Sequence, residues 1–487
     1  MESFNCSNLH HSVNGRPLHV VMFPWLAHGH ISPFIELSKR LAEKAVKISF
    51  VSTPRNIVNV KPSFEGLDVN LVELPLPQVD GLPPGIESTA HLPSHLMPLF
   101  HRAARGLEKP LKTFLEQISP DFLIFDGALM WASKVSLQLH IRAIMFMIFG
   151  AASMAYGCCR QRNHNDSEIT ANDLCQPPPG YPSSAIRQLP FEAKSILDFY
   201  TLKVAGDKTQ IDLVVDSYYE SSAIAIKSCY ELEEKFIQYY EQTTGRPVVP
   251  VGPLLPRPFP IKRGGPVHEQ KADCLKWLDN QQPSSVVYAS FGSEYFLSKV
   301  QMQEIALGLE DSQQPFLWVV RSPSEGIDEG KRVLDLLPKG FQCRTAERGV
   351  VLSGWAPQLE ILCHSATGGF MTHCGWSSVM EGMGLGLPLI AFPMQLDQGL
   401  NARLIAKELQ VGVEVERGSD GSVSRGDVCK AVRNAMVEEG GRHVRSKAAE
   451  MARRFRDKIL DGYGSQGSQK RYIEDFVKLL HRVKANS

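Results

Sequence analysis

The chain has 487 residues, more than one hydrophobic core usually holds, so we expect two or three domains. Its 52 basic residues balance its 52 acidic residues, so the chain has no net charge that would attract nucleic acid or an anionic membrane. Ten cysteines without a framework spacing are typical of a reducing compartment, and we expect a cytoplasmic protein. Residues 1–15 lack the basic start and apolar core of a signal peptide, so we expect a short disordered leader.

Short apolar runs alternate with helical patterns from residue 16 to residue 250. The apolar runs lie at 18–25, 46–53, 121–126 and 143–149. Continuous apolar strands separated by helices indicate a parallel sheet covered on both faces. Residues 143–159 carry no charge, but they only reach the lower length limit for a membrane span. Bulky residues followed by small ones indicate a buried strand and then a packed helix.

Prolines and glycines interrupt this alternation, and we predict a linker at 251–272 between an N-terminal domain (16–250) and a C-terminal domain (273–465). In the C-terminal domain the apolar runs lie at 285–293, 315–321, 349–355, 368–375 and 388–394. The predicted fold class is therefore α/β, with two doubly wound domains. Residues 466–487 are predicted to form a helix that packs back on the N-terminal domain, through Tyr472, Ile473, Phe476, Leu479 and Leu480.

The segment THCGWSSVMEG (372–382) is the main candidate site, because ligands of such sheets bind at the carboxyl ends of strands. A helix beginning there would offer free N–H groups and a partial positive charge to an anion. His373, Ser377 and Ser378 would add donors, and Gly375 would let the backbone approach a diphosphate. Ser378 and Glu381 also have the spacing of a capping box, which could serve only to begin the helix.

Two His-Cys pairs in this region raise the possibility of zinc. They are Cys363-His364 and His373-Cys374. Adjacent residues on a strand point to opposite faces, so neither pair converges on one ion, and no metal site is expected.

The 44-residue block from Trp355 to Gln398, WAPQLEILCHSATGGFMTHCGWSSVMEGMGLGLPLIAFPMQLDQ, closely resembles the donor-binding motif of plant family 1 UDP-sugar glycosyltransferases. The resemblance extends over nearly the whole chain. It implies the GT-B fold, in which two Rossmann-like domains face a central cleft. The donor-binding residues it implies are Ser293, Trp355, Ala356, Gln358, His373, Gly375, Trp376, Ser377, Ser378, Glu381, Asp397 and Gln398.

The roles implied by the resemblance make physical sense. Trp355 would stack on uracil, while Ala356 and Gln358 would meet the edge of the base through backbone groups. Glu381 would accept hydrogen bonds from the ribose hydroxyls. The resemblance assigns the phosphates to His373, Ser378 and Ser293, and the sugar to Trp376, Asp397 and Gln398. Ser377 departs from the family pattern, which usually has asparagine there.

The resemblance places the catalytic base in FPWLAHGHISPF (23–34), at His30. A histidine can accept a proton near neutral pH. His28 is a nearby rival that does not match the family position. Asp126 closes the run DFLIFD and matches the aspartate that orients the base. In the implied reaction His30 deprotonates an acceptor hydroxyl, which displaces UDP from the anomeric carbon with inversion. No cofactor is expected besides the UDP-sugar co-substrate, and no D-x-D motif suggests a bridging metal.

The segments FPWLAHGH, FVSTPRNI and VELPLPQVDGLPPGIEST resemble the family's branch-forming subgroup, which adds a sugar to the sugar of a terpenoid, steroid or flavonoid glycoside. We therefore expect a UDP-sugar and a small-molecule glycoside as partners, without nucleic acid, a membrane span or a second subunit. Glucose is favoured, with rhamnose or xylose as alternatives. An aglycone glucosyltransferase and a non-catalytic binding relative remain open. A glycoside hydrolase and an NAD enzyme are disfavoured, because no paired carboxylates and no G-x-G-x-x-G are evident.

Overall fold

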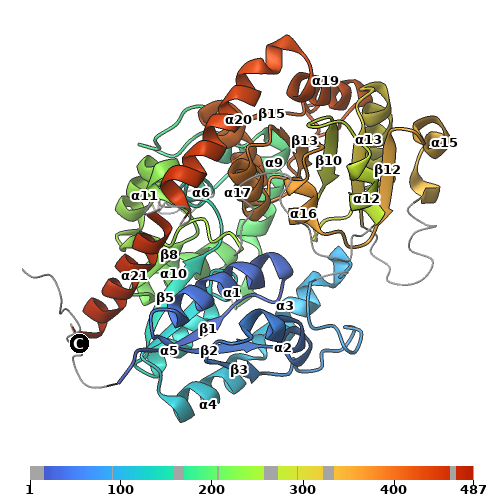
Figure 1. The fold of residues 1–487 in the computed structure, drawn as a ribbon. Coiled ribbons are helices and arrows are strands. Elements are labelled where there is room, and N and C mark those ends of the chain that lie inside the picture. The colour runs from blue at the N-terminus through green and yellow to red at the C-terminus, as the bar shows by residue number, and fades with distance from the viewer. Residues whose placement is uncertain are drawn as a thin grey trace, which may run out of the picture.

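The computed structural model describes residues 16–89, 92–157, 169–205, 208–256, 273–292, 294–321, 334–460 and 468–485. The expected leader, most of the expected linker and Ser293 lie outside the described residues. Figure 1 shows two lobes, each built around its own sheet, with the N-terminal sheet in the lower lobe and the C-terminal sheet in the upper one. The predicted class, two Rossmann-like α/β domains, is confirmed.

A seven-stranded parallel sheet forms the centre of the N-terminal lobe, in the order β3-β2-β1-β4-β5-β8-β9. Its strands are β1 (His19–Phe23), β2 (Lys47–Ser52), β3 (Val69–Glu73), β4 (Phe122–Asp126), β5 (Arg142–Met147), β8 (Ala223–Ile226) and β9 (Val248–Pro250). A separate antiparallel pair is formed by β6 (Lys203–Ala205) and β7 (Lys208–Thr209). Every residue of β1 and β4 is buried, as expected for continuous apolar runs covered on both faces.

Helices cover both faces of this sheet. They are α1 (His28–Ala42), α2 (Pro54–Val60), α3 (Met97–Arg105), α4 (Glu108–Ile118), α5 (Trp131–Gln138), α6 (Ala151–Gly157), α8 (Ala171–Leu174), α9 (Pro190–Thr201), α10 (Gln210–Glu220) and α11 (Tyr230–Thr244), with the 3₁₀ turns η1 (Lys61–Phe64) and η2 (Ser94–Leu96). The strand and helix predicted from the uncharged stretch are β5 and α6, so that prediction is confirmed. No helix among the described residues has both the length and the apolarity needed to cross a membrane.

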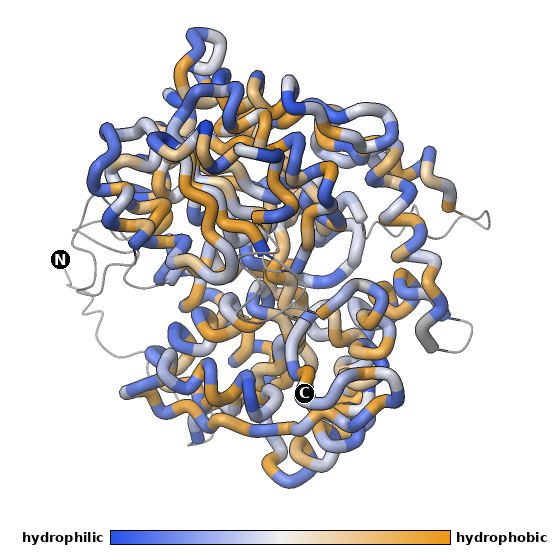
Figure 2. Tube along the Cα trace, turned by 90° about the vertical axis from the view of Figure 1, so that its right-hand side faces the viewer, coloured by the Kyte–Doolittle hydropathy of each residue, from blue (hydrophilic) through white to orange (hydrophobic). Residues whose placement is uncertain are grey.

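The C-terminal lobe contains a six-stranded parallel sheet in the order β12-β11-β10-β13-β14-β15. Its strands are β10 (Val286–Ser290), β11 (Phe316–Val320), β12 (Gly349–Ser353), β13 (Thr367–Thr372), β14 (Leu389–Ala391) and β15 (Gly412–Glu414). Its helices are α12 (Asp273–Asp279), α13 (Lys299–Asp311), α15 (Phe341–Thr345), α16 (Gln358–Cys363), α17 (Trp376–Leu385), α18 (Gln398–Arg403), α19 (Arg425–Met436) and α20 (Arg442–Arg454), with the short turns η3 (Leu404–Glu408), η4 (Glu439–Gly441) and η5 (Phe455–Ile459). Figure 2 shows hydrophobic segments running through the interior of both lobes.

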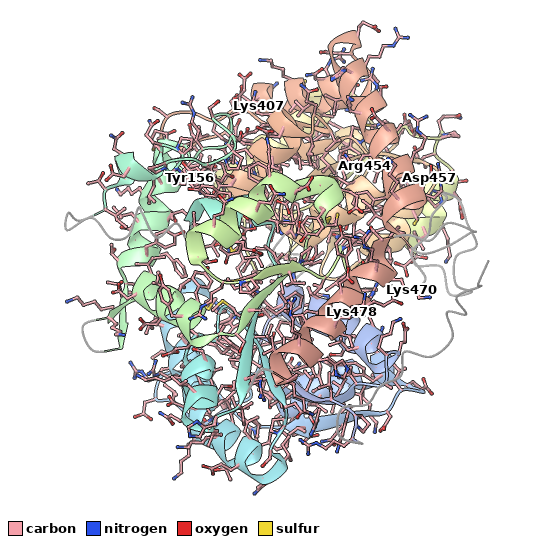
Figure 3. The ribbon with its side chains drawn as sticks, turned by 90° about the vertical axis from the view of Figure 1, so that its left-hand side faces the viewer. Tyr156, Lys407, Arg454, Asp457, Lys470 and Lys478 are labelled. Carbon is pink, nitrogen blue, oxygen red and sulfur yellow. The ribbon has the colours of Figure 1, made fainter. Side chains whose placement is uncertain are left out.

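The last helix of the chain, α21 (Ser468–Ala485), lies on the N-terminal lobe and not on the C-terminal lobe that precedes it in sequence. Its apolar residues Ile473, Phe476, Leu479 and Leu480 belong to the same core as residues of β1, β2 and α1. The Lys44 ammonium lies 2.7 Å from the Glu474 carboxylate at this contact. Figure 3, which labels Lys470 and Lys478, shows α21 along the outer side of the N-terminal lobe.

Strand order changes direction at one place in each sheet. In the N-terminal sheet this place lies between β1 and β4, and in the C-terminal sheet between β10 and β13. The loops after two such strands diverge and leave a crevice at their carboxyl ends, which is where doubly wound sheets bind ligands. His30, Asp126, Gly292 and His373 all follow or end these four strands, so the two crevices supply the residues of one site.

Candidate functional site

A cavity of about 430 Å³ lies between the two lobes and is lined by residues of both. His28, His30 and Phe149 line it from the N-terminal lobe. Apart from Ser293, which lies outside the described residues, every predicted donor-binding residue lines it: Trp355, Ala356, Gln358, His373, Gly375, Trp376, Ser377, Ser378, Glu381, Asp397 and Gln398. The structure therefore gathers into one cleft residues that are up to 370 positions apart in the sequence, from His28 to Gln398.

His30 and Asp126 form a hydrogen-bonded pair on the N-terminal wall of the cleft. The Nδ1 atom of His30 lies 2.9 Å from Oδ2 of Asp126. The Asp126 side chain is 1% exposed, and its other oxygen, Oδ1, accepts the backbone N–H of Ala128 at 2.9 Å. Both carboxylate oxygens are thus occupied, so Asp126 holds the imidazole with Nδ1 protonated and leaves Nε2 as the proton acceptor.

The two histidines of this wall differ in their electrostatic surroundings. Burial lowers the pKa of His30, but the charge and hydrogen bond of Asp126, helped by Glu294 and Asp397, raise its pKa overall above the ordinary histidine value. Burial and the charge of Arg321 lower the pKa of His28. A raised pKa would make His30 the stronger base of the two, in line with what the resemblance implies.

One helix, α1, carries both histidines. It begins at His28, with Ala27 as the preceding cap residue. His30 therefore lies in the first turn, where its backbone N–H is bonded to the carbonyl of Ala27 at 3.0 Å. The helical turn thus fixes the backbone of His30, and the bond to Asp126 holds its ring.

The loop between β13 and α17 is held in an unusual backbone conformation. Cys374 has φ +66, in the left-handed region that non-glycine residues rarely adopt. Its carbonyl accepts a hydrogen bond from Asn401 Nδ2 at 3.0 Å, and its backbone N–H donates to Thr372 Oγ1 at 3.2 Å. These bonds on both sides fix the loop, and neighbouring structure thereby offsets the cost of the positive φ.

His373 is enclosed by two glycines. A Cβ atom at Gly375 would lie 2.4 Å from its Nε2 atom, and one at Gly292 would lie 2.7 Å from the same atom. Gly292 also has φ +79, so a side chain is excluded there on two grounds. Burial lowers the pKa of His373 to about 4, and the ring is neutral at pH 7. His373 would therefore meet a phosphate as a neutral N–H donor, not as a cation.

Helix α17 begins at Trp376, directly after Gly375, and no side chain caps it. The alternative interpretation, a capping box of Ser378 and Glu381, does not apply, because the helix begins two residues before Ser378. Both side chains instead bond to Gln358 at the start of α16: its Nε2 donates to Glu381 Oε2 at 2.8 Å and to Ser378 Oγ at 3.2 Å. No side-chain cap therefore occupies the first N–H groups of α17, and its residues Trp376, Ser377 and Ser378 line the cleft.

The bonds of Gln358 add a function that sequence analysis did not assign. The resemblance implied only a backbone contact with a base, whereas the side chain orients the carboxylate expected to bind ribose. Burial raises the pKa of Glu381, while the Gln358 bond and the charge of Lys227 act in the opposite direction. A carboxylate fixed on one oxygen keeps the other for a ligand.

Trp376 joins the two lobes. Its indole N–H donates to the backbone carbonyl of Lys227, in the N-terminal lobe, at 2.6 Å, and the residue is 3% exposed. A Cβ atom at Gly150 would lie 3.2 Å from the indole ring, so the lobes are in close contact there. The indole has only this one polar atom, which is therefore not available to a sugar.

Asp397 and Gln398 are fixed by bonds within their own loop. Asn401 Nδ2 lies 2.7 Å from Asp397 Oδ2, and Gln398 Oε1 accepts the backbone N–H groups of Met394 and Gln395 at 3.0 and 3.1 Å. Burial raises the pKa of Asp397 to about 6, and the charge of His30 acts against that shift. The mutual influence of Asp397 and His30 places the expected sugar-binding loop opposite the expected base.

Trp355 differs from the other residues of the cleft because it is 81% exposed. It follows β12 and Gly354, whose φ of +91 turns the chain outward at this point. An exposed indole on a cavity wall offers a flat apolar surface to a planar ring.

Glu294 was not predicted from the sequence. Its Oε1 accepts a hydrogen bond from Thr89 Oγ1 of the N-terminal lobe at 2.7 Å, and its charge raises the pKa of His30. Thr89 belongs to the 72–89 segment that sequence analysis associated with acceptor choice. Only a contact across 205 positions reveals this role, so no local pattern could have indicated it.

Two family models match the chain: "UDP-glucoronosyl and UDP-glucosyl transferase" over residues 263–449 and "Glycosyltransferase, N-terminal domain" over residues 16–173. The mogroside IIIx synthase of Siraitia grosvenorii is 40% identical over 458 residues, covering 91% of this chain and 95% of that protein. The beta-D-glucosyl crocetin beta-1,6-glucosyltransferase of Gardenia jasminoides is 36% identical over 434 residues, covering 88% and 93%. A solved structure of UGT73P12 from Glycyrrhiza uralensis, complexed with glycyrrhetinic acid 3-O-monoglucuronide, matches with a TM-score of 0.78 and 25% identity over 97% of both chains.

Proposed function

The chain belongs to the family of plant UDP-dependent glycosyltransferases, and from that membership we propose that it transfers glucose from UDP-glucose to a sugar hydroxyl of a small-molecule glycoside. Glycosyltransferase activity, with a UDP-sugar donor and a small-molecule acceptor, follows from the family itself. The proposal concerns the identity of the sugar, the class of acceptor and the residues that carry the reaction. The observation that carries it is the His30–Asp126 pair, which lies across one cleft from the loop between β13 and α17.

In the proposed reaction the acceptor hydroxyl gives its proton to Nε2 of His30 as its oxygen attacks the anomeric carbon. The bond from that carbon to the UDP oxygen breaks at the same time, so the configuration inverts. Asp126 stabilises the imidazolium that forms. The growing charge on UDP is received by the N–H groups at the start of α17 and by the neutral donor His373.

The proposed donor site follows the order of the loops along the cleft. Trp355 stacks on uracil, Glu381 binds the ribose hydroxyls, and Ser378 and the N-terminus of α17 bind the diphosphate. Asp397 and Gln398 contact the sugar. We propose that the reaction needs no metal, because a helix N-terminus and fixed side-chain donors can carry the diphosphate charge. Turnover that stops in excess chelator and returns with Mg²⁺ would contradict this part.

Two observations favour a glycoside as the acceptor. The relatives include a protein named as a beta-D-glucosyl crocetin beta-1,6-glucosyltransferase, a name that describes addition of glucose to a molecule that already carries a sugar, and one named as a mogroside IIIx synthase. The segment 72–89, which resembles the branch-forming subgroup, reaches the cleft through the bond between Thr89 and Glu294. Loops that differ between relatives and face the cleft are the usual determinants of acceptor choice.

A donor-by-acceptor screen tests the proposal. UDP-glucose, UDP-rhamnose and UDP-xylose are each paired with aglycones and with the matching monoglucosides, and products are identified by mass spectrometry and fragmentation. Faster conversion of monoglucosides, with a disaccharide at one position, supports the proposal. Equal or faster conversion of the aglycones would identify an aglycone glucosyltransferase. Preference for UDP-rhamnose with every acceptor would overturn the assignment of glucose.

A further inference from the structure

A buried lysine outside all the residues assigned so far contacts the diphosphate-binding helix from the opposite lobe. Lys227 directly follows β8 and is 2% exposed. Its Nζ atom donates a hydrogen bond to Ser377 Oγ at 2.6 Å. Ser377 lies in the first turn of α17 and lines the cleft, so the ammonium is one hydrogen bond away from the proposed phosphate site.

The charge of Lys227 is poorly compensated by the surrounding protein. Of the nearby acids, Glu36 is already bonded to Lys39 at 3.0 Å and to Arg40 at 2.7 Å, and Glu381 is bonded to Gln358. Among the described residues Ser377 is the one hydrogen-bond acceptor of the ammonium, which has three N–H groups. The positive end of the α17 dipole lies beside it and repels it further.

Burial lowers the pKa of Lys227 to about 8, so the side chain is still mostly protonated at neutral pH. A buried cation with two unused N–H groups is costly unless a negative group lies close by. The anion expected at this place is the diphosphate of the donor, because the same helix N-terminus faces it.

The direction of the hydrogen bond defines what Ser377 can do. An ammonium has no lone pair, so Lys227 must donate and Ser377 Oγ must accept. The hydroxyl hydrogen of Ser377 therefore remains free to be donated to a second group, and a hydroxyl that accepts from a cation is a stronger donor. This arrangement also gives a physical reason for a serine where the family pattern usually has asparagine, because the short side chain meets a lysine of the other lobe.

We propose that Lys227 is a positioning residue for the donor diphosphate: it orients Ser377 as a hydrogen-bond donor to a phosphate oxygen and supplies a buried positive charge from the N-terminal lobe. The inference rests on the proposed function, since it requires that a nucleoside diphosphate binds at α17. It adds that the acceptor lobe takes part in holding the donor.

Calorimetry of Lys227→Met with uridine and with UDP tests the proposal. The loss of one charge-assisted hydrogen bond should weaken UDP binding roughly 10- to 100-fold. Uridine has no phosphate, so its affinity should change less than about twofold. Ser377→Ala, which removes only a hydroxyl, should weaken UDP in the same selective way. In the double variant the two losses should be less than additive, because both residues act through one bond.

Lys235→Met is the matched control. This lysine also bridges the lobes, through an ion pair with Glu408 at 2.7 Å, but it does not line the cleft. Its UDP affinity should equal that of the wild type. Unchanged UDP affinity in both Lys227→Met and Ser377→Ala, or an equal loss of uridine and UDP affinity, would overturn the proposal in favour of a purely structural contact. A wild-type protein that binds neither uridine nor UDP would instead contradict the proposed function.

Discussion

Replacing Asp126 with asparagine should disable His30 while leaving the fold intact. In the wild type one carboxylate oxygen accepts from His30 Nδ1 and the other from the N–H of Ala128. Asparagine has one oxygen for these two donors. If that oxygen still accepts the N–H of Ala128, the side-chain NH₂ of the asparagine faces Nδ1 of His30. The ring proton must then move to Nε2, which is the atom that should act as the base.

The size of the effect follows from these contacts. Turning the amide to keep the correct tautomer leaves the N–H of Ala128 unpaired, at about 1–3 kcal/mol, and the imidazolium loses a bond to a charged partner, about 1.5–3 kcal/mol. The two together come to about 2.5–6 kcal/mol, or roughly a 10²–10⁴-fold lower kcat. That range agrees with the usual contribution of a positioned general base, about 10²–10⁴-fold. UDP affinity should barely change, since Asp126 lies in the acceptor lobe.

The pH profile of kcat/KM provides the decisive assay. Activity needs neutral His30, so in the wild type it should rise with pH through a pKa above the ordinary histidine value. Without the Asp126 charge the lowering effect of burial predominates, so the rising limb should move to lower pH in Asp126→Asn. His28→Ala is the control and should keep most activity. An unmoved limb in Asp126→Asn, or an inactive His28→Ala beside an active His30→Ala, would refute the reasoning.

Three further outcomes are expected. Trp355→Ala and Glu381→Ala should each weaken UDP binding by about 1–3 kcal/mol in calorimetry, the scale of a lost base stack or buried hydrogen bond, and unchanged affinity in both would remove the uridine assignment. Gln398→Ala should lower turnover and leave UDP affinity nearly intact, because it frees the N–H groups of Met394 and Gln395 and loosens the loop beside the sugar; a loss confined to UDP binding would contradict this. Exhaustive dialysis against EDTA should leave kcat unchanged. A loss of activity that added Mg²⁺ restores would show that the reaction needs a metal.

Long apolar runs made the fold class predictable, because nearly every position of a strand buried on both faces is apolar. Strands β1, β2, β4, β10, β11 and β12 lie within the runs identified in the sequence, and β5 begins one residue before its run. Strands β3, β8, β9 and β15 lie outside these runs and were not predicted. The domain boundaries remain predictions, since most of the linker lies outside the described residues.

The site was predictable where a motif is contiguous and less so where distant segments meet. The spacing of Ser378 and Glu381 left a capping box open, whereas α17 begins at Trp376 and both side chains bond to Gln358 of the preceding helix. Lys227 contacts Ser377 across 150 positions, and nothing in its own neighbourhood indicates that contact. The orienting bonds of Asn401 and Gln358 likewise appear only once the chain is folded.

The position of α21 has a consequence for the order in which the protein can be made. The N-terminal lobe shares its core with Ile473, Phe476, Leu479 and Leu480, which are synthesised last. During translation that lobe therefore emerges with an apolar strip uncovered until the final helix has left the ribosome, while the C-terminal lobe is already complete. A stop codon just before α21 should thus damage the first domain and not the one it truncates. The N-terminal lobe is thus built from two separate stretches of the chain, so it cannot be excised as one continuous piece without losing part of its core.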